Sequence, residues 1–255
     1  MQDEVTLRRG HNWVRAPEGT RDRLFAECAG RRRLENRMME LLAGRGYREV
    51  ATPGLEYYNL FAQTGYPLPE EGMYKLTDRE GRLLVLRPDL TMPIARLAAT
   101  RLAGEELPLR LCAAHSVYRM RSSYTGRPGE WRQGGAELIG AAGLTADAEI
   151  ITLAADCLRA LGIDDFRLEI GHAEPALYDA FKDAWFGKAI LLDPKLSGEM
   201  DYYTGMIFRA YTPGAGRAVL QGGRYDKLLG LLGRDLPACG FSADIDALAD
   251  MLPEE

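Results

Sequence analysis

Residues 109–139 read LRLCAAHSVYRMRSSYTGRPGEWRQGGAELI, and they contain two strand-like segments joined by a polar loop. Leu109 to Arg119 and Glu130 to Ile139 are rich in apolar residues, whereas the loop from Arg121 to Gly129 is rich in polar and turn-forming residues. Two strands that follow each other across one such loop pair in the antiparallel orientation. The segment therefore predicts that the fold is built on an antiparallel sheet.

Hairpin patterns recur on both sides of this segment. Met73 to Thr77 with Leu83 to Arg87, and Met200 to Ala210 with Ala218 to Gln221, each flank a turn. Because hairpins outnumber the strand–helix–strand alternations of a parallel sheet, the sequence favours an α+β domain whose antiparallel sheet is flanked by helices. Shorter strands are predicted at residues 47–52, 166–172 and 238–243. Helices are predicted at residues 21–45, 91–102, 145–161 (with Thr145 as its N-cap), 175–186, 225–232 and 245–252.

The composition limits the class of protein. A chain of 255 residues that is 46% hydrophobic and 27% charged suits one globular domain, not a disordered, collagen-like or coiled-coil chain. No apolar run is long enough to cross a bilayer, and residues 1–10 lack a signal-peptide pattern, so we expect a cytoplasmic protein without a membrane partner. Four widely spaced cysteines predict reduced core thiols. The net charge of −5 argues against a general nucleic-acid surface.

Polar residues inside apolar strands are the main sign of a binding site. No phosphate-binding loop, dinucleotide fingerprint, nucleophile elbow or metal-ligand spacing is present, so we expect no cofactor and no metal. Gln133 and Glu137 share one face of their strand, as do Asp201 and Tyr203. With Asp89, such a face fits an ammonium group and a polar aromatic ring, which predicts an amino-acid pocket. The alternative is a buried ion-pair network that uses Arg87, Arg119 and Arg224.

These residues lie in the same order as in the class II aminoacyl-tRNA synthetase core, and the chain resembles the histidyl branch of that family. The resemblance covers most of residues 16–250 and implies a six-stranded antiparallel sheet, flanking helices and a dimer. The matching motifs are Gly46–Val50 with Pro53 and Glu56, Leu86–Thr91, Val117–Arg119, Gly126–Arg127, Trp131–Gln133 with Glu137, Met200–Gly205, Gly222–Asp226 and Gly240–Phe241.

The resemblance also implies a pocket for free histidine. Arg119 matches the synthetase residue that contacts the carboxylate of the amino acid. The other matching positions contact its amino group and imidazole, and Asp89 is a shorter carboxylate than the usual glutamate. The complete set of implied histidine-binding residues is Asp89, Thr91, Arg119, Gln133, Glu137, Tyr203 and Tyr225.

Four positions that serve ATP binding or activation in the synthetases differ in this chain. Arg121 stands where an adenine-binding glutamate is expected, and Gly198 where a catalytic arginine is expected. Ala247 replaces an ATP-binding arginine, and Asp244 replaces a glycine. Because these changes remove cations that stabilise phosphoryl charge and add a carboxylate that repels a triphosphate, we expect no adenylation and no catalytic residue.

A pocket that keeps its ligand residues but loses its activation residues is typical of a sensor. Leu86 to Arg96 and Glu137 to Gly140 most resemble the synthetase-like regulatory subunits of ATP phosphoribosyltransferase, the first enzyme of histidine biosynthesis. This resemblance implies a non-catalytic subunit that activates the short-form catalytic subunit and senses histidine. The implied partners are that catalytic subunit, a second copy of the chain in a homodimer within a hetero-oligomer, and free histidine, with no nucleic acid.

The chain is shorter than typical members of either family. Only 28 residues separate His172 from Asp201, where both families carry a small inserted domain, and no anticodon-binding domain follows Met251. We therefore expect one synthetase-like domain over residues 1–255 that lacks both. Two other hypotheses stay open. One is a synthetase-like ligase that activates an amino acid with ATP for a non-tRNA acceptor, and the other is a dimerisation module with an inert pocket.

Overall fold

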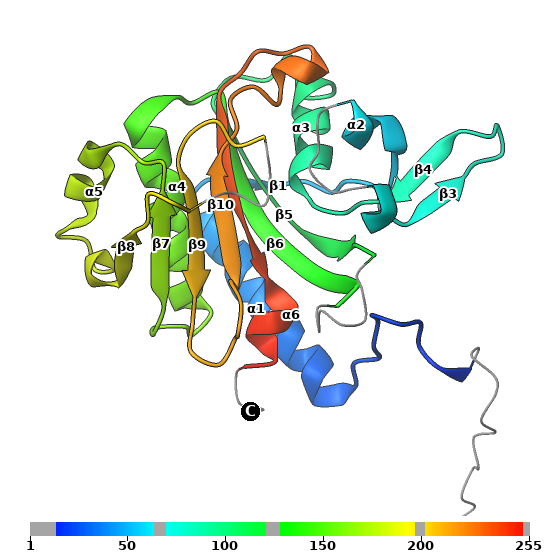
Figure 1. The fold of residues 1–255 in the computed structure, drawn as a ribbon, viewed down its shortest axis with the longest axis horizontal. Coiled ribbons are helices and arrows are strands. Elements are labelled where there is room, and N and C mark those ends of the chain that lie inside the picture. The colour runs from blue at the N-terminus through cyan, green and yellow to red at the C-terminus, as the bar shows by residue number, and fades with distance from the viewer. Residues whose placement is uncertain (1–13, 64–69, 121–127, 197–201, 252–255) are drawn as a thin grey trace, which may run out of the picture.

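A computed structural model of the chain describes residues 14–63, 70–120, 128–196 and 202–251. Figure 1 shows a large sheet and a small sheet with helices packed around them. The large sheet contains β1 (Arg48–Glu49), β5 (Leu109–Tyr118), β6 (Glu130–Ile139), β7 (Arg167–Gly171), β8 (Ile190–Leu192), β9 (Ile207–Tyr211), β10 (Leu220–Arg224) and β11 (Ala238–Asp244). The small sheet contains β2 (Leu55–Tyr57), β3 (Lys75–Thr77) and β4 (Leu83–Leu86).

The large sheet has the strand order β1-β5-β6-β11-β10-β9-β7-β8. Its six inner strands pair with one another only in the antiparallel orientation, which confirms the α+β class and the six-stranded antiparallel sheet. The hairpin predicted from residues 109–139 forms with a register from Leu109↔Ile139 to Tyr118↔Glu130. The sequence did not predict that β1 and β8 join the two edges in the parallel orientation.

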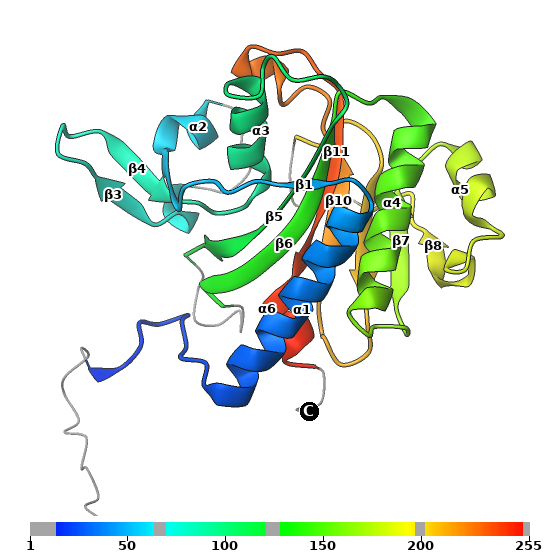
Figure 2. The same ribbon diagram turned by 180° about the vertical axis from the view of Figure 1, so that it is seen from behind.

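Helices cover the two faces of the large sheet unequally. Figure 2 shows the two longest helices side by side across one face, whereas the opposite face is covered mainly at one end. No helix among the described residues combines the length and apolar character needed to cross a membrane. The α-helices are α1 (Phe25–Gly44), α2 (Tyr58–Ala62), α3 (Thr91–Ala99), α4 (Gly143–Ala160), α5 (Pro175–Phe181) and α6 (Ile245–Ala249). Short 3-10 turns occur at Glu70–Gly72, Gly187–Ala189 and Gly230–Leu232.

Two hydrophobic clusters hold these layers together. In α1, Leu34, Met38 and Leu42 recur every four residues, are almost fully buried, and pack with α4 against the covered face of the sheet. The second cluster lies under α3, where Met92 and Ile94 pack against the opposite face. Because this second cluster occupies only one end of its face, the rest of that face is left for polar side chains.

Two of the predicted helices differ from the structure. The helix predicted to begin at Thr145 begins at Gly143, and no side chain caps it. The helix predicted at residues 225–232 is wrong, because this segment forms turns that end in the 3-10 turn Gly230–Leu232. The Tyr225 N–H donates to the Ala238 carbonyl oxygen (2.8 Å), and this bond to β11 prevents Tyr225 from joining a helix.

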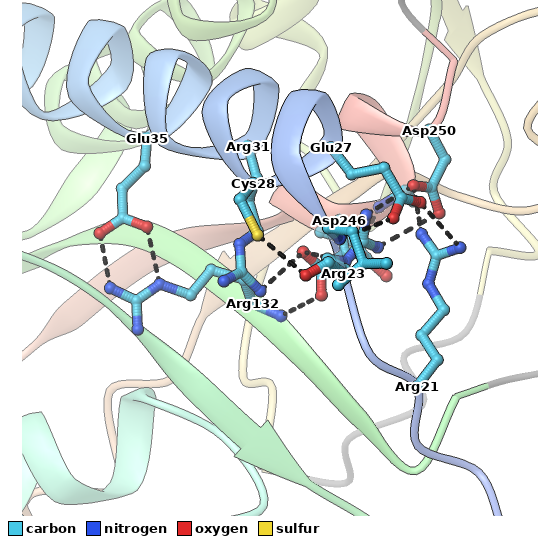
Figure 3. Close-up of polar contacts among 12 residues, drawn as sticks. Arg21, Arg23, Glu27, Cys28, Arg31, Glu35, Arg132, Asp246 and Asp250 are labelled. Carbon is cyan, nitrogen blue, oxygen red and sulfur yellow. Dashed lines mark hydrogen bonds and ion pairs between the residues drawn. The ribbon is translucent and has the colours of Figure 1, made fainter. Parts of the chain in front are cut away.

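A group of charged residues, here called the charged clamp, joins α1 and the segment before it to α6 and β6 (Figure 3). Its centre is Asp246, which is 8% exposed. Asp246 Oδ2 accepts the backbone N–H of Arg132 (2.9 Å), and Oδ1 lies 3.5 Å from Arg23 Nε and 3.6 Å from Arg31 Nη1. Arg23 also donates to Asp250 (2.7 Å). The clamp therefore ties α6 to two other elements that are distant in sequence.

From the charged clamp we predict unequal losses of stability when its two aspartates are replaced by alanine. Asp246→Ala should lower the free energy of unfolding by about 2–4 kcal/mol, because it leaves a buried backbone N–H and arginine charges without their partner. Asp250→Ala should cost less than about 1 kcal/mol, because that carboxylate is half exposed. Denaturant unfolding of both variants measures this difference. Equal losses would contradict the central position of Asp246.

Candidate functional site

Polar side chains from six separate segments line a cavity on the open face of the sheet. Six of the seven predicted histidine-binding residues are among them. The seventh, Glu137, is not part of the lining but lies beneath Thr91 and Tyr225. The lining residues are Asp89, Thr91, Arg119, Gln133, Tyr202, Tyr203, Gln221, Gly222, Tyr225, Gly240, Phe241 and Ser242.

Glu137 is a carboxylate buried in the middle of the sheet. Its side chain accepts hydrogen bonds from the hydroxyl groups of Tyr225 and Thr91. A Cβ at position 240, on the neighbouring strand, would overlap Glu137 Oε2, so the carboxylate requires a glycine there. Burial raises the pKa of Glu137 to about 7, although the two hydroxyl groups oppose this shift. Loss or gain of its proton therefore occurs near neutral pH.

The start of α3 is fixed over β6 by two side chains. Gln133 accepts the Leu90 N–H through Oε1 (3.2 Å) and donates through Nε2 to Ser242 Oγ (3.0 Å). Asp89 Oδ1 accepts the Met92 N–H (3.1 Å) in the first turn of the helix. These bonds hold the first turn of α3 where the hydroxyl group of Thr91 reaches Glu137.

Three tyrosine rings close the cavity. The ring centres of Tyr202 and Tyr203 are 5.1 Å apart, and Tyr202 packs edge-on against Tyr225 at 5.8 Å. Tyr203 lies against the backbone of Gly223, where a Cβ would come within 2.6 Å of its ring. The remaining volume is about 10 Å³, roughly the space of one water molecule. A free amino acid therefore enters this cavity only if the tyrosine rings move apart.

Two of the buried arginines lie away from this cavity and serve the scaffold. Arg224 donates to Asp147 (2.7 Å) and Asp226 (2.8 Å), so it does belong to a buried ion-pair network, but one built on carboxylates other than Asp89 and Glu137. Arg87 instead donates to backbone carbonyl groups, including that of Thr52 (2.7 Å). Burial lowers the pKa of Arg87, but these carbonyl bonds satisfy its guanidinium group. Neither residue lines the cavity.

A second cavity of about 220 Å³ adjoins the first. Arg119, Gln133, Gln221 and Ser242 line both cavities. The Nε of Arg119 donates to the Pro88 carbonyl oxygen (2.9 Å). Because Arg119 is held at the boundary between the two cavities, its guanidinium group can face an anionic group placed in either one.

Asp244 lies in the second cavity and makes two contacts. Its Oδ2 lies 2.7 Å from Nη2 of Arg217, another lining residue. Its Oδ1 accepts the Ala247 N–H (2.8 Å), so Asp244 caps the N-terminus of α6. Burial raises the pKa of Asp244, and the neighbouring Arg217 opposes that shift. An anionic ligand in this cavity would therefore meet the carboxylate of Asp244 with its paired Arg217, and two further arginines of the lining, Arg119 and Arg209.

The remaining predicted positions fall into two groups. Asp244 and Ala247 lie together at the start of α6, whereas Arg121, Gly198 and Asp201 fall outside the described residues. Within the described part of the chain, no group of three or more His, Cys, Asp or Glu side chains is arranged to hold a metal ion.

Sequence reasoning did not include Gln221 and Ser242 among the site residues. They are direct partners in the β10–β11 register, and both line the two cavities. Gln221 ends one predicted strand and Ser242 lies within another, so the sequence predicts only that each side chain points to one of the two faces of a sheet. Only the register between the two strands shows that they meet beside Gln133.

Comparison with known proteins gives one consistent family. The family model for histidyl-tRNA synthetase matches residues 19–184 and 176–248. An ATP phosphoribosyltransferase regulatory subunit of Clostridium acetobutylicum is 33% identical over 320 aligned positions, which cover 93% of this chain and 79% of that protein. The structure of an ATP phosphoribosyltransferase regulatory subunit/histidyl-tRNA synthetase from Bacillus halodurans C is 28% identical, with a TM-score of 0.83 over 94% of this chain and 83% of the other. Apo histidyl-tRNA synthetase of S. aureus is 28% identical, with a TM-score of 0.78 over 94% of this chain and 70% of the other.

The buried carboxylate predicts a pH-dependent stability. The pKa of Glu137 is about 7 in the folded chain and 4.5 in an unperturbed glutamate, so the folded state holds an extra proton between these values. The contribution of Glu137 to the free energy of unfolding should therefore fall as pH rises from about 4.5 to 7, by on the order of 2–3 kcal/mol relative to a side chain that does not titrate there. Glu137→Gln should lose this slope, whereas the exposed Glu130→Gln on the same strand should keep it. Parallel profiles for wild type and Glu137→Gln, from denaturant unfolding at several pH values, would contradict the assignment.

Proposed function

We propose a histidine-dependent regulatory function from the premise that the chain belongs to the ATP phosphoribosyltransferase regulatory subunits, which have the histidyl-tRNA synthetase fold. It is therefore a regulatory component and not the catalytic one, and its family acts in histidine biosynthesis. The proposal is that the chain binds the short-form catalytic subunit, activates it, and changes that activation when free histidine binds.

One observation carries the proposal. Six residues expected to bind an amino acid line a single cavity, while the adjoining cavity contains Asp244 paired with Arg217. In a synthetase the adjoining region would have to accept the phosphates of ATP. The carboxylate of Asp244 repels phosphate oxygens and offsets the charge of Arg217, which leaves Arg119 and Arg209 as the other cations of this lining. This arrangement supports binding of an amino acid without its activation.

The polarity of the first cavity suits the groups of free histidine. We propose that Asp89 and Glu137 attract the ammonium group and that Arg119 contacts the carboxylate. We further propose that Gln133 and Tyr225 contact the imidazole, whose ring packs well against aromatic side chains. Because the three tyrosine rings fill the cavity, the liganded and unliganded states must differ in their packing. Such a difference is what allows a bound ligand to favour one state of an assembly over another.

We also propose that the chain acts as a homodimer inside a hetero-oligomer and forms one synthetase-like domain without an inserted domain. The alignment with the Clostridium acetobutylicum relative supports the second point, because 320 aligned positions exceed the 255 residues of this chain. The relative therefore has additional residues inside the aligned region.

The function predicts an effect on the catalytic partner. Addition of this chain to the short-form catalytic subunit of the same organism should raise its ATP phosphoribosyltransferase rate, and histidine should alter that stimulated rate. Steady-state assays with and without the chain, across a histidine titration, measure both effects. If the rate does not change at any ratio of the two proteins, the regulatory proposal fails. ATP-dependent pyrophosphate exchange by the chain alone would instead favour the amino-acid-activating ligase.

The pocket predicts the effect of two substitutions on histidine binding. Glu137→Ala should weaken binding at least about tenfold, because the ammonium group loses a charged partner and the hydroxyl groups of Thr91 and Tyr225 lose their acceptor. Tyr225→Ala should weaken the binding of free histidine more than the binding of free alanine, because alanine has no imidazole ring. Isothermal titration calorimetry measures both effects, with the exposed Glu130→Ala as the matched control. Unchanged affinity in Glu137→Ala would remove this residue from the site.

A further inference from the structure

The large sheet ends at β8, an edge strand at the opposite end of the sheet from β1 (Figure 1). It pairs with β7 on one side only, in the register Leu168↔Ile190 to Ile170↔Leu192. The Asp193 N–H donates to the Ile170 carbonyl oxygen (3.0 Å). In a parallel pair, every second residue directs both its N–H and its C=O group to the neighbouring strand. Because Asp193 bonds to β7, the preceding Leu192 directs its N–H and C=O groups away from β7, toward the open edge.

The two edge strands of the sheet differ in the features that prevent an additional strand from pairing with them. The opposite edge, β1, consists of the exposed charged residues Arg48 and Glu49. In contrast, β8 has the sequence Ile190-Leu191-Leu192, without a charge or a proline. Charged side chains and prolines are the usual means by which proteins keep an edge strand from pairing. Within the described residues, β8 itself carries neither device, and the nearest charge and proline are Asp193 and Pro194, just after the strand ends.

Both faces of β8 are exposed. Leu191 pairs with Glu169 and Leu192 with the buried Ile170, so the two leucines point to opposite faces of the sheet. Leu191 is 46% exposed and Leu192 is 45% exposed. A partner that packed on one face would cover only one of them. An additional strand beside β8 would contact both, because its own side chains also alternate between the faces.

A preformed anchor lies next to this edge. Trp185 is 45% exposed, but its indole is held by a hydrogen bond from Nε1 to Asp156 (3.1 Å) and by the Arg159 guanidinium group 5.0 Å from its ring centre. Trp185 and Lys188 border an open hollow of about 550 Å³ that ends at the residues preceding β8. A rigid, half-exposed tryptophan beside a hollow is typical of the residues that dominate binding energy at interfaces.

The family model also divides close to this region. The two segments matched by the family model meet at residues 176–184, within and just after α5. The relative of Clostridium acetobutylicum has residues in its aligned region that this chain lacks.

We propose that β8 and Trp185 form the docking site for a short extended segment of the catalytic subunit, which adds a strand to the sheet at β8. This inference rests on the proposed function, because that function supplies the partner. The docking segment would place apolar side chains against Leu191 and Leu192 and one larger side chain in the hollow beside Trp185.

The size of the exposed area favours a short segment over a second copy of the chain. Leu191, Leu192 and Trp185 together offer on the order of 300 Å² of apolar surface, which is the size of a single patch. A stable interface between two copies needs about 800 Å² on each partner. An extended peptide gains its remaining affinity from backbone hydrogen bonds, and the outward-facing groups of Leu192 supply these.

The test measures binding of the full chain to the short-form catalytic subunit of the same organism by isothermal titration calorimetry. Leu192→Lys and Trp185→Ala should each weaken binding at least about tenfold, because one adds a charge to the edge and the other removes the anchor. Leu231→Lys is the matched control, because this leucine is 59% exposed and lies in another part of the fold. It should bind within about twofold of the unaltered chain.

Hydrogen exchange of the unaltered chain provides a measurement that does not depend on any variant. The Leu192 amide should exchange at least about tenfold more slowly in the complex than in the free chain. If Leu192→Lys and Trp185→Ala bind as tightly as the control and this amide is not protected, the inference is wrong while the proposed function stands. If the unaltered chain does not bind the catalytic subunit, the proposed function fails and the inference with it. If Leu192→Lys reduces the mass of the isolated chain in sedimentation, the edge joins two copies, and the inference is also wrong.

Discussion

A carboxylate buried in the centre of an antiparallel sheet constrains every element around it. A Cβ at position 240 on the neighbouring strand β11 would overlap the carboxylate of Glu137, so this position is Gly240. The carboxylate must be hydrogen-bonded because an unsatisfied buried charge is costly, and the hydroxyl groups of Tyr225 and Thr91 meet this need. Thr91 can do so only because Asp89 and Gln133 hold the first turn of α3 in place. The candidate pocket thus depends on one buried charge.

Strand alternation separates the polar residues of the sheet into two functions. On β6, Arg132 points toward the helices and pairs with Glu35 of α1 through two bonds of 2.5 and 2.7 Å, whereas its neighbour Gln133 points into the cavity. On β10, Arg224 turns away from the cavity and pairs with Asp147 of α4. Polar side chains on the covered face therefore hold the layers together, while those on the open face are available to a ligand.

Asp244 connects the stability of the fold with the loss of activation chemistry. Its carboxylate caps α6 and pairs with Arg217, so the residue is useful to the folded chain. The same carboxylate lowers the positive charge that Arg119, Arg209 and Arg217 give to the second cavity, which is part of our proposal that the chain does not activate an amino acid. A single side chain therefore supports the fold and opposes the reaction that the related synthetases perform, which agrees with a family of regulatory subunits.

The sequence by itself determined the antiparallel hairpin of residues 109–139 and the long first helix, and the resemblance to the synthetases supplied the candidate pocket residues, because periodicity and order along the chain are local properties. It placed Glu137 and Gln133 on one face correctly, since side chains alternate along a strand. It could not predict that Glu137 lies beneath Thr91 and Tyr225, that Gln221 meets Ser242, or that β1 and β8 add parallel edges. The tertiary structure alone decided these points, because register, burial and hydrogen-bond partners depend on contacts between residues that are far apart in the chain.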